Sequence, residues 1–190
     1  MSKGDEDDML LRHTREGDEL AFVSLYQRHR EPLYRFSLRM LGDTAEAEDV
    51  VHDCLVSLLQ RPESYDPARA PLRTYLFGVA RHQVWKRLRR HGNLEGLEES
   101  GLETTADSNL GPLGILDQQR TAEQVAAAVL ALTPPQREAL VLFEYEGLSL
   151  AEIAVLAGVD VGTISARLHR ARNTLRKSLA HLACDPVRKP

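Results

Sequence analysis

Residues 149–177 constrain the fold more than any other stretch of this 190-residue chain. Ser149 and Glu152 have the spacing of a capping box, in which a hydroxyl and a carboxylate satisfy two backbone N–H groups at the start of a helix. Gly158 can adopt the left-handed conformation that ends such a helix. Asp160 can cap the next helix. The pattern predicts two short helices joined by a glycine turn.

The second predicted helix has one apolar face and one cationic face. Ile164, Leu168 and Leu175 recur at helical spacing on the apolar side. An α-helix fits the major groove of DNA. We therefore interpret this stretch as a helix-turn-helix that contacts DNA, although a helical hairpin with a solvated basic face has the same pattern. The cationic side chains are Arg167, Arg170, Arg172, Arg176 and Lys177.

The composition favours a helical protein without membrane insertion. Hydrophobic residues make up 43% of the sequence, charged residues 27% and aromatic residues 5%. No run approaches the ~18 apolar residues of a transmembrane helix, and the acidic N-terminus lacks the apolar segment of a signal peptide. Cys54 and Cys184 do not make a disulfide framework. We expect a cytoplasmic protein.

The net charge of −4 hides two cationic segments. Phosphate contacts are local, because salt screens charges beyond about 8–10 Å. An acidic segment follows the first cationic segment, and the second begins at Arg167. This distribution is compatible with nucleic-acid binding. Between residues 61 and 91 the basic residues are Arg61, Arg69, Arg73, Arg81, Lys86, Arg87, Arg89 and Arg90, against Glu63 and Asp66.

Residues 92–120 separate the cationic segments and have the composition of a flexible linker. They are rich in glycine, serine and acidic residues and show little periodicity. We predict two small helical domains, residues 10–91 and 121–182, joined by this acidic linker. No segment shows convincing strand alternation, so the predicted fold class is all-α.

Helical periodicity and proline positions divide the two domains further. Pro32 either kinks or interrupts the first long helix, and Asp43 or Thr44 can cap the second. Pro134 starts a helix that precedes the helix-turn-helix. The expected helices cover residues 18–41, 45–60, 72–90 and 136–145, with a proline-rich loop at 61–71.

Three stretches carry a resemblance to a known family. They are Ala47–Cys54; Tyr75–His82 with Lys86–Arg90; and Leu132–Glu138 with Glu152–Ala154 and Gly162–Arg172. In this order, with a linker between them, they resemble bacterial RNA polymerase sigma factors of the extracytoplasmic function (ECF) group, in the sigma-70 superfamily. The resemblance implies a subunit, not an enzyme, that binds core RNA polymerase, directs it to the −10 and −35 elements of promoters and promotes strand opening.

The resemblance assigns −10 recognition to the loop 61–71 and the helix after it. The loop would capture a flipped base, and stacking of a base on an aromatic ring contributes ~1–3 kcal/mol. Tyr75 is the best stacking candidate, Phe77 is expected in the core, and Trp85 could serve either role. The residues implied in −10 binding are Arg69, Arg73, Tyr75, Arg81, His82, Trp85, Lys86 and Arg89.

The resemblance assigns −35 recognition to the second helix of the helix-turn-helix. Arg170 is best suited to read guanine, and Thr163 could give its hydroxyl or N–H to a phosphate at the helix start. The residues implied in −35 binding are Thr163, Ser165, Ala166, Arg167, His169, Arg170, Arg172 and Arg176.

Polymerase docking is implied on the helix 45–60, through Asp49, His52, Asp53 and Ser57. Asp49 and Asp53 are one turn apart and would present a pair of carboxylates to a basic surface. An anti-sigma factor is a further implied partner. The linker would follow the RNA exit path of the polymerase, where its acidity mimics nucleic acid.

The sequence departs from the family pattern at positions that bear on the promoter sequence. Tyr75 replaces a usual tryptophan, and His82 and Lys86 replace a frequent asparagine and aspartate. Ser165 and Ala166 stand where a basic residue and a serine are common. These changes leave the recognised promoter sequence open.

Two other functions remain compatible with the sequence. One is a stand-alone helix-turn-helix regulator that binds duplex DNA as a dimer, and the other is a helical adaptor whose basic faces bind acidic proteins.

We find no catalytic constellation and predict neither a cofactor nor a metal. His52 with Cys54 and His181 with Cys184 give only a weak hint of metal or redox sensing, because Cys54 lies on an apolar stripe.

Overall fold

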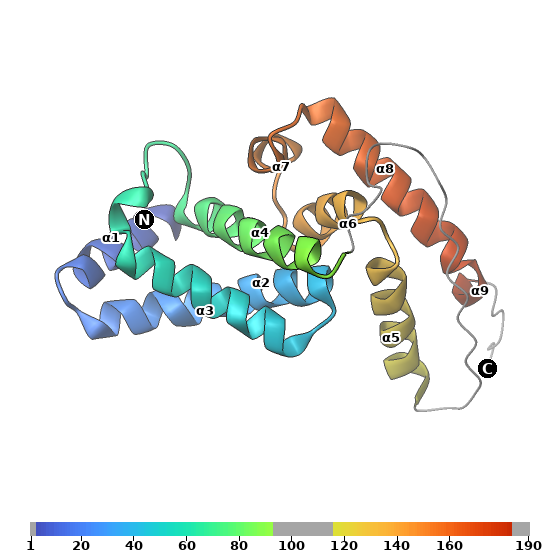
Figure 1. Cartoon of the computed structure of the whole chain (residues 1–190), viewed down its shortest axis with the longest axis horizontal. Helices are drawn as coiled ribbons and strands as arrows, with labels where there is room; N and C mark the ends of the chain where they lie inside the picture. Colours follow the sequence, from blue (N-terminus) through green and yellow to red (C-terminus); the bar gives the residue numbers. More distant parts are fainter. Residues whose placement is uncertain (1–2, 93–115, 184–190) are drawn as a thin grey trace, which may run out of the picture.

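The computed structural model describes residues 3–92 and 116–183, and these ranges are helical without strands (Figure 1). The all-α prediction is confirmed. Residues 93–115, most of the predicted linker, lie outside the described residues, and α5 begins at Leu116, before the predicted start of the second domain. The elements are α1 (Lys3–Arg15), α2 (Glu19–Leu41), α3 (Thr44–Gln60), the 3₁₀ turn η1 (Pro62–Ser64), α4 (Leu72–Arg90), α5 (Leu116–Leu130), α6 (Pro134–Leu140), the π-helical turn η2 (Val141–Tyr145), α7 (Leu150–Ala157), α8 (Val161–Ser178) and α9 (Ala180–Ala183).

Helix α2 is the centre of the N-terminal half and packs against α1, α3 and α4. The Asp18 side chain caps its start by accepting hydrogen bonds from the N–H groups of Leu20 and Ala21. Pro32 lies inside this helix, which continues through it to Leu41. Phe36 of α2 meets Phe77 of α4 edge to face, with ring centroids 5.7 Å apart. As expected, Phe77 is therefore a core residue.

Helix α1 begins before the predicted domain boundary at residue 10. Its acidic sequence lacks a strong apolar period, but Asp7 is buried and pairs with two basic side chains of α2. Its carboxylate accepts a 2.7 Å hydrogen bond from Arg28 and lies 3.1 Å from His29. Burial raises the pKa of Asp7, but the interactions with His29 and Arg28 outweigh it and hold this pKa below 3.8. Charge pairing therefore docks this helix together with Leu11, which is buried in the core.

Helix α3 follows the sequence prediction closely. Asp43 caps it through a 2.8 Å hydrogen bond from the N–H of Glu46. Cys54 is fully buried in the core, and burial raises its pKa to about 12. The thiol is thus a small hydrophobic group in the packing, as its place on the apolar stripe indicated.

The C-terminal half contains the predicted helix-turn-helix in α7 and α8. Ser149 and Glu152 form the capping box, Gly158 is left-handed with φ of +68°, and Asp160 caps α8. The helix expected at 136–145 differs from the prediction. It is α6 up to Leu140 and then widens into η2, a π-helical turn that a helical apolar period does not distinguish from an α-helix.

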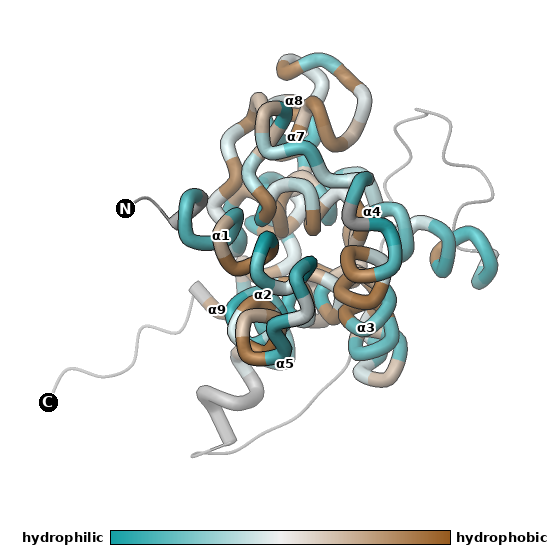
Figure 2. Tube along the Cα trace, turned by 90° about the vertical axis from the view of Figure 1, so that its left-hand side faces the viewer, coloured by the Kyte–Doolittle hydropathy of each residue, from teal (hydrophilic) through white to brown (hydrophobic). Residues whose placement is uncertain are grey.

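The two halves pack against each other in the described ranges. α2 contacts α5, α6 and η2, and α4 contacts α7. Figure 2 shows apolar and polar segments alternating along the helices of both halves. The buried Arg137 of α6 donates hydrogen bonds to the main-chain oxygens of Met40, Leu130 and Leu132. It therefore joins the end of α2 to the end of α5.

Candidate nucleic-acid interface

The outward face of α8 presents the side chains predicted to face bases. Ile164, Leu168 and Ala171 are buried against the rest of the C-terminal half. In Figure 1 the helix runs along the edge of the molecule, with one long side free of other elements. The exposed side chains on that face are Ser165, Ala166, His169 and Arg170.

The start of α8 gives Thr163 a partner within the chain. Both donors of Thr163 bind Asp160: its N–H reaches Oδ1 at 2.8 Å and its hydroxyl reaches Oδ2 at 2.6 Å. These hydrogen bonds lower the pKa of Asp160. A phosphate contact from Thr163 would therefore have to replace or share hydrogen bonds of the helix cap.

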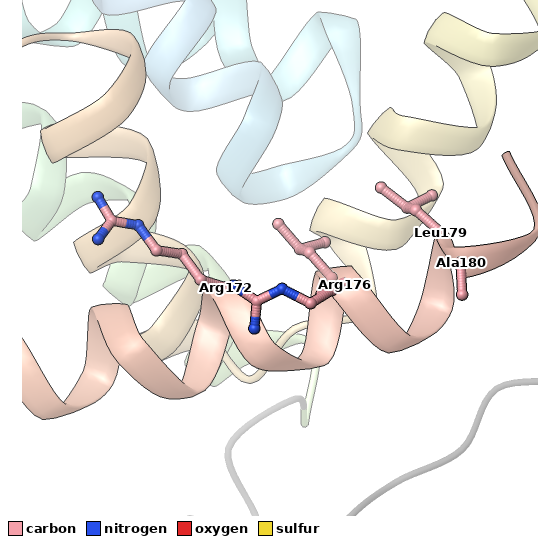
Figure 3. Close-up of a pocket in the computed structure, with 5 residues that line it drawn as sticks. Arg172, Arg176, Leu179 and Ala180 are labelled. Carbon is pink, nitrogen blue, oxygen red and sulfur yellow. The ribbon is translucent and has the colours of Figure 1, made fainter. Parts of the chain in front are cut away.

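The last two turns of α8 hold their arginines through local partners. Arg172 donates to the carboxylate of Glu144, and Arg176 donates to Asn173 Oδ1 at 2.8 Å. Both arginines line a groove together with the apolar side chains of Leu175, Leu179 and Ala180 (Figure 3). Phosphate binding by Arg172 would require exchange of its carboxylate partner.

On α4, the structure brings two predicted −10 residues onto one carboxylate of the C-terminal half. Trp85 Nε1 donates a 2.5 Å hydrogen bond to Glu138 Oε1, and Arg81 Nε forms a 2.8 Å ion pair with the same oxygen. Glu138 is only 1% exposed. Burial raises the pKa of Glu138, and Arg81 and Trp85 oppose this shift. Trp85 is half-buried: the guanidinium of Arg81 lies over its ring, 5.6 Å from the centroid, and its N–H binds a buried acid.

The first turn of α4 contacts the C-terminal half through a second set of polar groups. Arg73 donates to the main-chain oxygen of Glu146 and lies 3.9 Å from its carboxylate. Arg35 of α2 lies 3.7 Å from the same carboxylate. Thr74 donates a 3.1 Å hydrogen bond to Glu152, the residue that also caps α7. Burial raises the pKa of Glu146, against the opposing effect of the arginines.

The remaining predicted −10 residues are accessible to a ligand to different degrees. Arg69, His82, Lys86 and Arg89 are exposed. Tyr75 is half-buried, with its ring 5.3 Å from that of Tyr65.

Sequence reasoning missed Tyr65, which anchors the loop 61–71. Tyr65 is buried, and its hydroxyl donates a 2.7 Å hydrogen bond to Asp8 of α1. An aromatic residue in a proline-rich loop is the sequence signal that could have identified it. Tyr65 therefore supports both the loop and the candidate stacking residue Tyr75.

The predicted polymerase-binding residues are not equivalent in the structure. Asp49 and His52 are exposed on α3. Asp53, in contrast, forms a 3.1 Å ion pair with Arg87 of α4. Ser57 donates its hydroxyl hydrogen to the main-chain oxygen of Cys54 at 2.8 Å. Of the predicted pair of carboxylates, Asp49 is exposed and Asp53, with a side chain 45% exposed, shares its carboxylate with an arginine that sequence spacing does not reveal.

Metal binding finds no support in the described part of the chain. Within residues 3–92 and 116–183, no group of three histidine, cysteine or acidic side chains could hold an ion. Cys184, which with His181 gave the weak hint of metal binding at the C-terminus, lies outside the described residues.

Within residues 3–92 and 116–183, no helix is both long and apolar enough to span a membrane.

Family comparisons agree with this arrangement of two helical halves. Residues 25–93 match the model for sigma-70 region 2, and residues 122–175 match the model for sigma-70 region 4. The chain is thus a two-domain protein of the sigma-70 class. SigL, an ECF RNA polymerase sigma factor of Mycobacterium tuberculosis, is 35% identical over 84% of this chain and 89% of its own length. SigW of Bacillus subtilis is 28% identical over 90% of this chain and 96% of its own length.

The chain belongs to the ECF RNA polymerase sigma factors. It is therefore a promoter-directing subunit of RNA polymerase and not an enzyme. Two solved structures are similar, each at 25% identity. One is RpoE of Bartonella quintana in complex with the anti-sigma factor NepR, with a TM-score of 0.63 over 84% of this chain and 96% of that chain. The other is CnrH in complex with the cytosolic domain of CnrY, with a TM-score of 0.66 over 95% and 99%.

Proposed function

We propose that residues 10–91 bind core RNA polymerase and open the −10 element, that 92–120 act as a linker, and that 121–182 read the −35 element. The outward face of α8 carries this proposal. Four adjacent side chains of different chemistry are exposed there, on a helix whose opposite face is buried. Exposure on one face is what major-groove recognition requires.

The proposed polymerase and −10 contacts of the N-terminal half rest on exposed side chains. Asp49 and His52 offer a polymerase contact on α3, and His82, Lys86 and Arg89 offer a cationic edge on α4. Tyr75 offers an aromatic face beside the loop that would capture a base. We further propose that the protein acts in the cytoplasm, where polymerase and promoters are found.

An anti-sigma factor is a further proposed partner. The similar RpoE structure is a complex with the anti-sigma factor NepR, and it covers 84% of this chain. A stand-alone regulator is not favoured, because residues 25–93 match sigma-70 region 2. A regulator that binds only duplex DNA has no need for that region.

Transcription in vitro tests the proposal directly. Core RNA polymerase would be supplied with this protein as its only specificity subunit and with a library of promoter fragments. We expect co-elution with the core enzyme and transcripts from a defined subset of promoters. Arg170→Ala should change selection at −35, whereas Arg30→Ala, at an exposed arginine of α2, should not. Lack of co-elution, or transcription independent of promoter sequence, would refute the proposed function.

A further inference from the structure

Three polar side chains on the second half of α8 form a chain of hydrogen bonds. Arg176 donates from a guanidinium nitrogen to Asn173 Oδ1 at 2.8 Å. Asn173 Nδ2 lies 2.9 Å from Nε2 of His169, one helical turn earlier. His169 is exposed and belongs to the face of α8 that the proposed function assigns to the −35 bases. An arginine near the end of the helix is thus connected to an imidazole that faces DNA.

The chemistry of the three groups fixes the direction of each hydrogen bond. A guanidinium has N–H donors and no acceptor, so the atom of Asn173 that faces Arg176 is the carbonyl oxygen. The amide nitrogen of Asn173 then faces His169, and this nitrogen too can only donate. Nε2 of His169 therefore accepts, which requires that it carry no proton. In the neutral ring the proton lies on the other nitrogen, Nδ1.

The protonated nitrogen of His169 is available to a ligand. Nδ1 has no hydrogen-bond partner among residues 3–92 and 116–183. In the major groove, guanine presents N7 and O6 as acceptors, adenine presents N7 and thymine presents O4, whereas cytosine presents an amino donor. A single N–H donor is satisfied by any of the first three bases and is opposed by cytosine.

We propose that Asn173 and Arg176 determine the base specificity of His169, by holding its imidazole as an Nδ1–H donor that reads guanine, adenine or thymine and excludes cytosine. The inference rests on the proposed −35 role of α8. Asn173 and Arg176 are positioning residues, because they act through the ring of His169 and not on the base. A guanidinium has five N–H donors, so Arg176 can orient the amide and still contact a phosphate.

The position of the ring proton can be measured on the whole chain without DNA. Nitrogen-15 correlation spectra of histidine side chains distinguish a protonated ring nitrogen from an unprotonated one, and His169→Asn identifies the signals of this ring among the seven histidines. Above pH ~8, where an ordinary histidine is neutral, we expect a proton on Nδ1 and none on Nε2. In Asn173→Ala, a second form with the proton on Nε2 should appear. A proton on Nε2 in the unchanged chain would overturn the inference.

Selection of promoters by the reconstituted holoenzyme measures the base preference. The library would randomise each base pair of the −35 element, and the position that loses its preference in His169→Ala is the one that His169 reads. At this position we expect cytosine to be disfavoured by roughly 10-fold, because an opposed donor loses a hydrogen bond. Asn173→Ala should reduce this difference to about 2-fold or less. The preference at the position read by Arg170 should not change.

Matched variants separate this role from a structural one. Gln124→Ala removes another half-buried amide from the C-terminal half and should leave every base preference unchanged. If Asn173 only stabilised α8, its loss would weaken transcription from all promoters alike and would keep the preference against cytosine. Arg176→Met frees the amide to turn its oxygen toward His169, so the preference should weaken at the same position. A role of Arg176 in phosphate binding alone would instead weaken all promoters equally.

Two outcomes distinguish this inference from the proposed function. If promoters are selected at −35 and Asn173→Ala keeps the full preference against cytosine, the inference is refuted while the proposed function stands. If α8 selects no base at −35, the proposed function fails and the base preference of His169 fails with it, whichever ring nitrogen carries the proton.

Discussion

Replacement of Arg137 by methionine tests how the two halves are held together. The guanidinium donates to three main-chain oxygens, those of Met40 at the end of α2 and of Leu130 and Leu132 around the end of α5. Helix C-termini leave such oxygens without partners within the helix. Methionine keeps much of the apolar volume of the arginine stem and removes every donor.

The expected loss of stability follows from two opposing contributions. A hydrogen bond to a charged group contributes about 1.5–3 kcal/mol, so three are worth about 4.5–9 kcal/mol. Burial lowers the pKa of Arg137 to about 10, and this destabilisation of the cation corresponds to about 3 kcal/mol. Arg137→Met removes both contributions. We expect the free energy of unfolding to fall by about 1.5–6 kcal/mol.

Urea unfolding followed by circular dichroism measures this loss. Arg137→Lys should give an intermediate value, because an ammonium group cannot span the same three acceptors. Arg30→Met, at an exposed arginine of α2, is the control and should change stability by less than about 0.5 kcal/mol. If Arg137→Met destabilised no more than this control, Arg137 would not connect the halves as argued.

Three smaller perturbations probe other parts of the chain. Ser149→Ala should cost about 1 kcal/mol in urea unfolding through loss of the α7 cap, and an unchanged midpoint would contradict it. Because Asp7 has a lowered pKa, its contribution is present above pH 3.8 and is lost as the pH falls through its folded value. Thermal melts of Asp7→Asn should therefore vary less below about pH 4 than those of the unchanged chain. Tyr65→Phe removes the hydrogen bond to Asp8 and should cost about 1 kcal/mol while increasing proteolysis in the loop 61–71, and equal cleavage of both proteins would argue against this anchor.

Signals within a few residues of each other predicted the local structure well. The capping box at Ser149, the left-handed Gly158 and the cap at Asp160 all appear where the spacing places them. Each depends on a backbone geometry that neighbouring residues determine. The burial of Cys54 was predictable for the same reason, since its position on an apolar stripe fixes which way it faces.

Interactions between distant residues could not be predicted from spacing. Trp85 and Glu138 are 53 positions apart, and Arg137 and Met40 are 97 apart. Helical periodicity shows which side of a helix is apolar, but not which acid of one half meets which base of the other. Asp53 illustrates the consequence: its carboxylate looked free in the sequence, and the structure pairs it with Arg87.

The predicted site residues show the same difference between local and long-range information. Residue type shows what a side chain can bind, so arginines and Thr163 were assigned to DNA. The structure shows that carboxylates of the same chain use these donors first: Asp160 binds Thr163, Glu144 binds Arg172 and Glu138 binds Arg81. Since a carboxylate and a phosphate present similar acceptors to one donor, we predict that DNA displaces the internal partner at each such pair. On this hypothesis, the affinity of the protein for a promoter depends on the strength of its internal ion pairs as well as on the number of its cations.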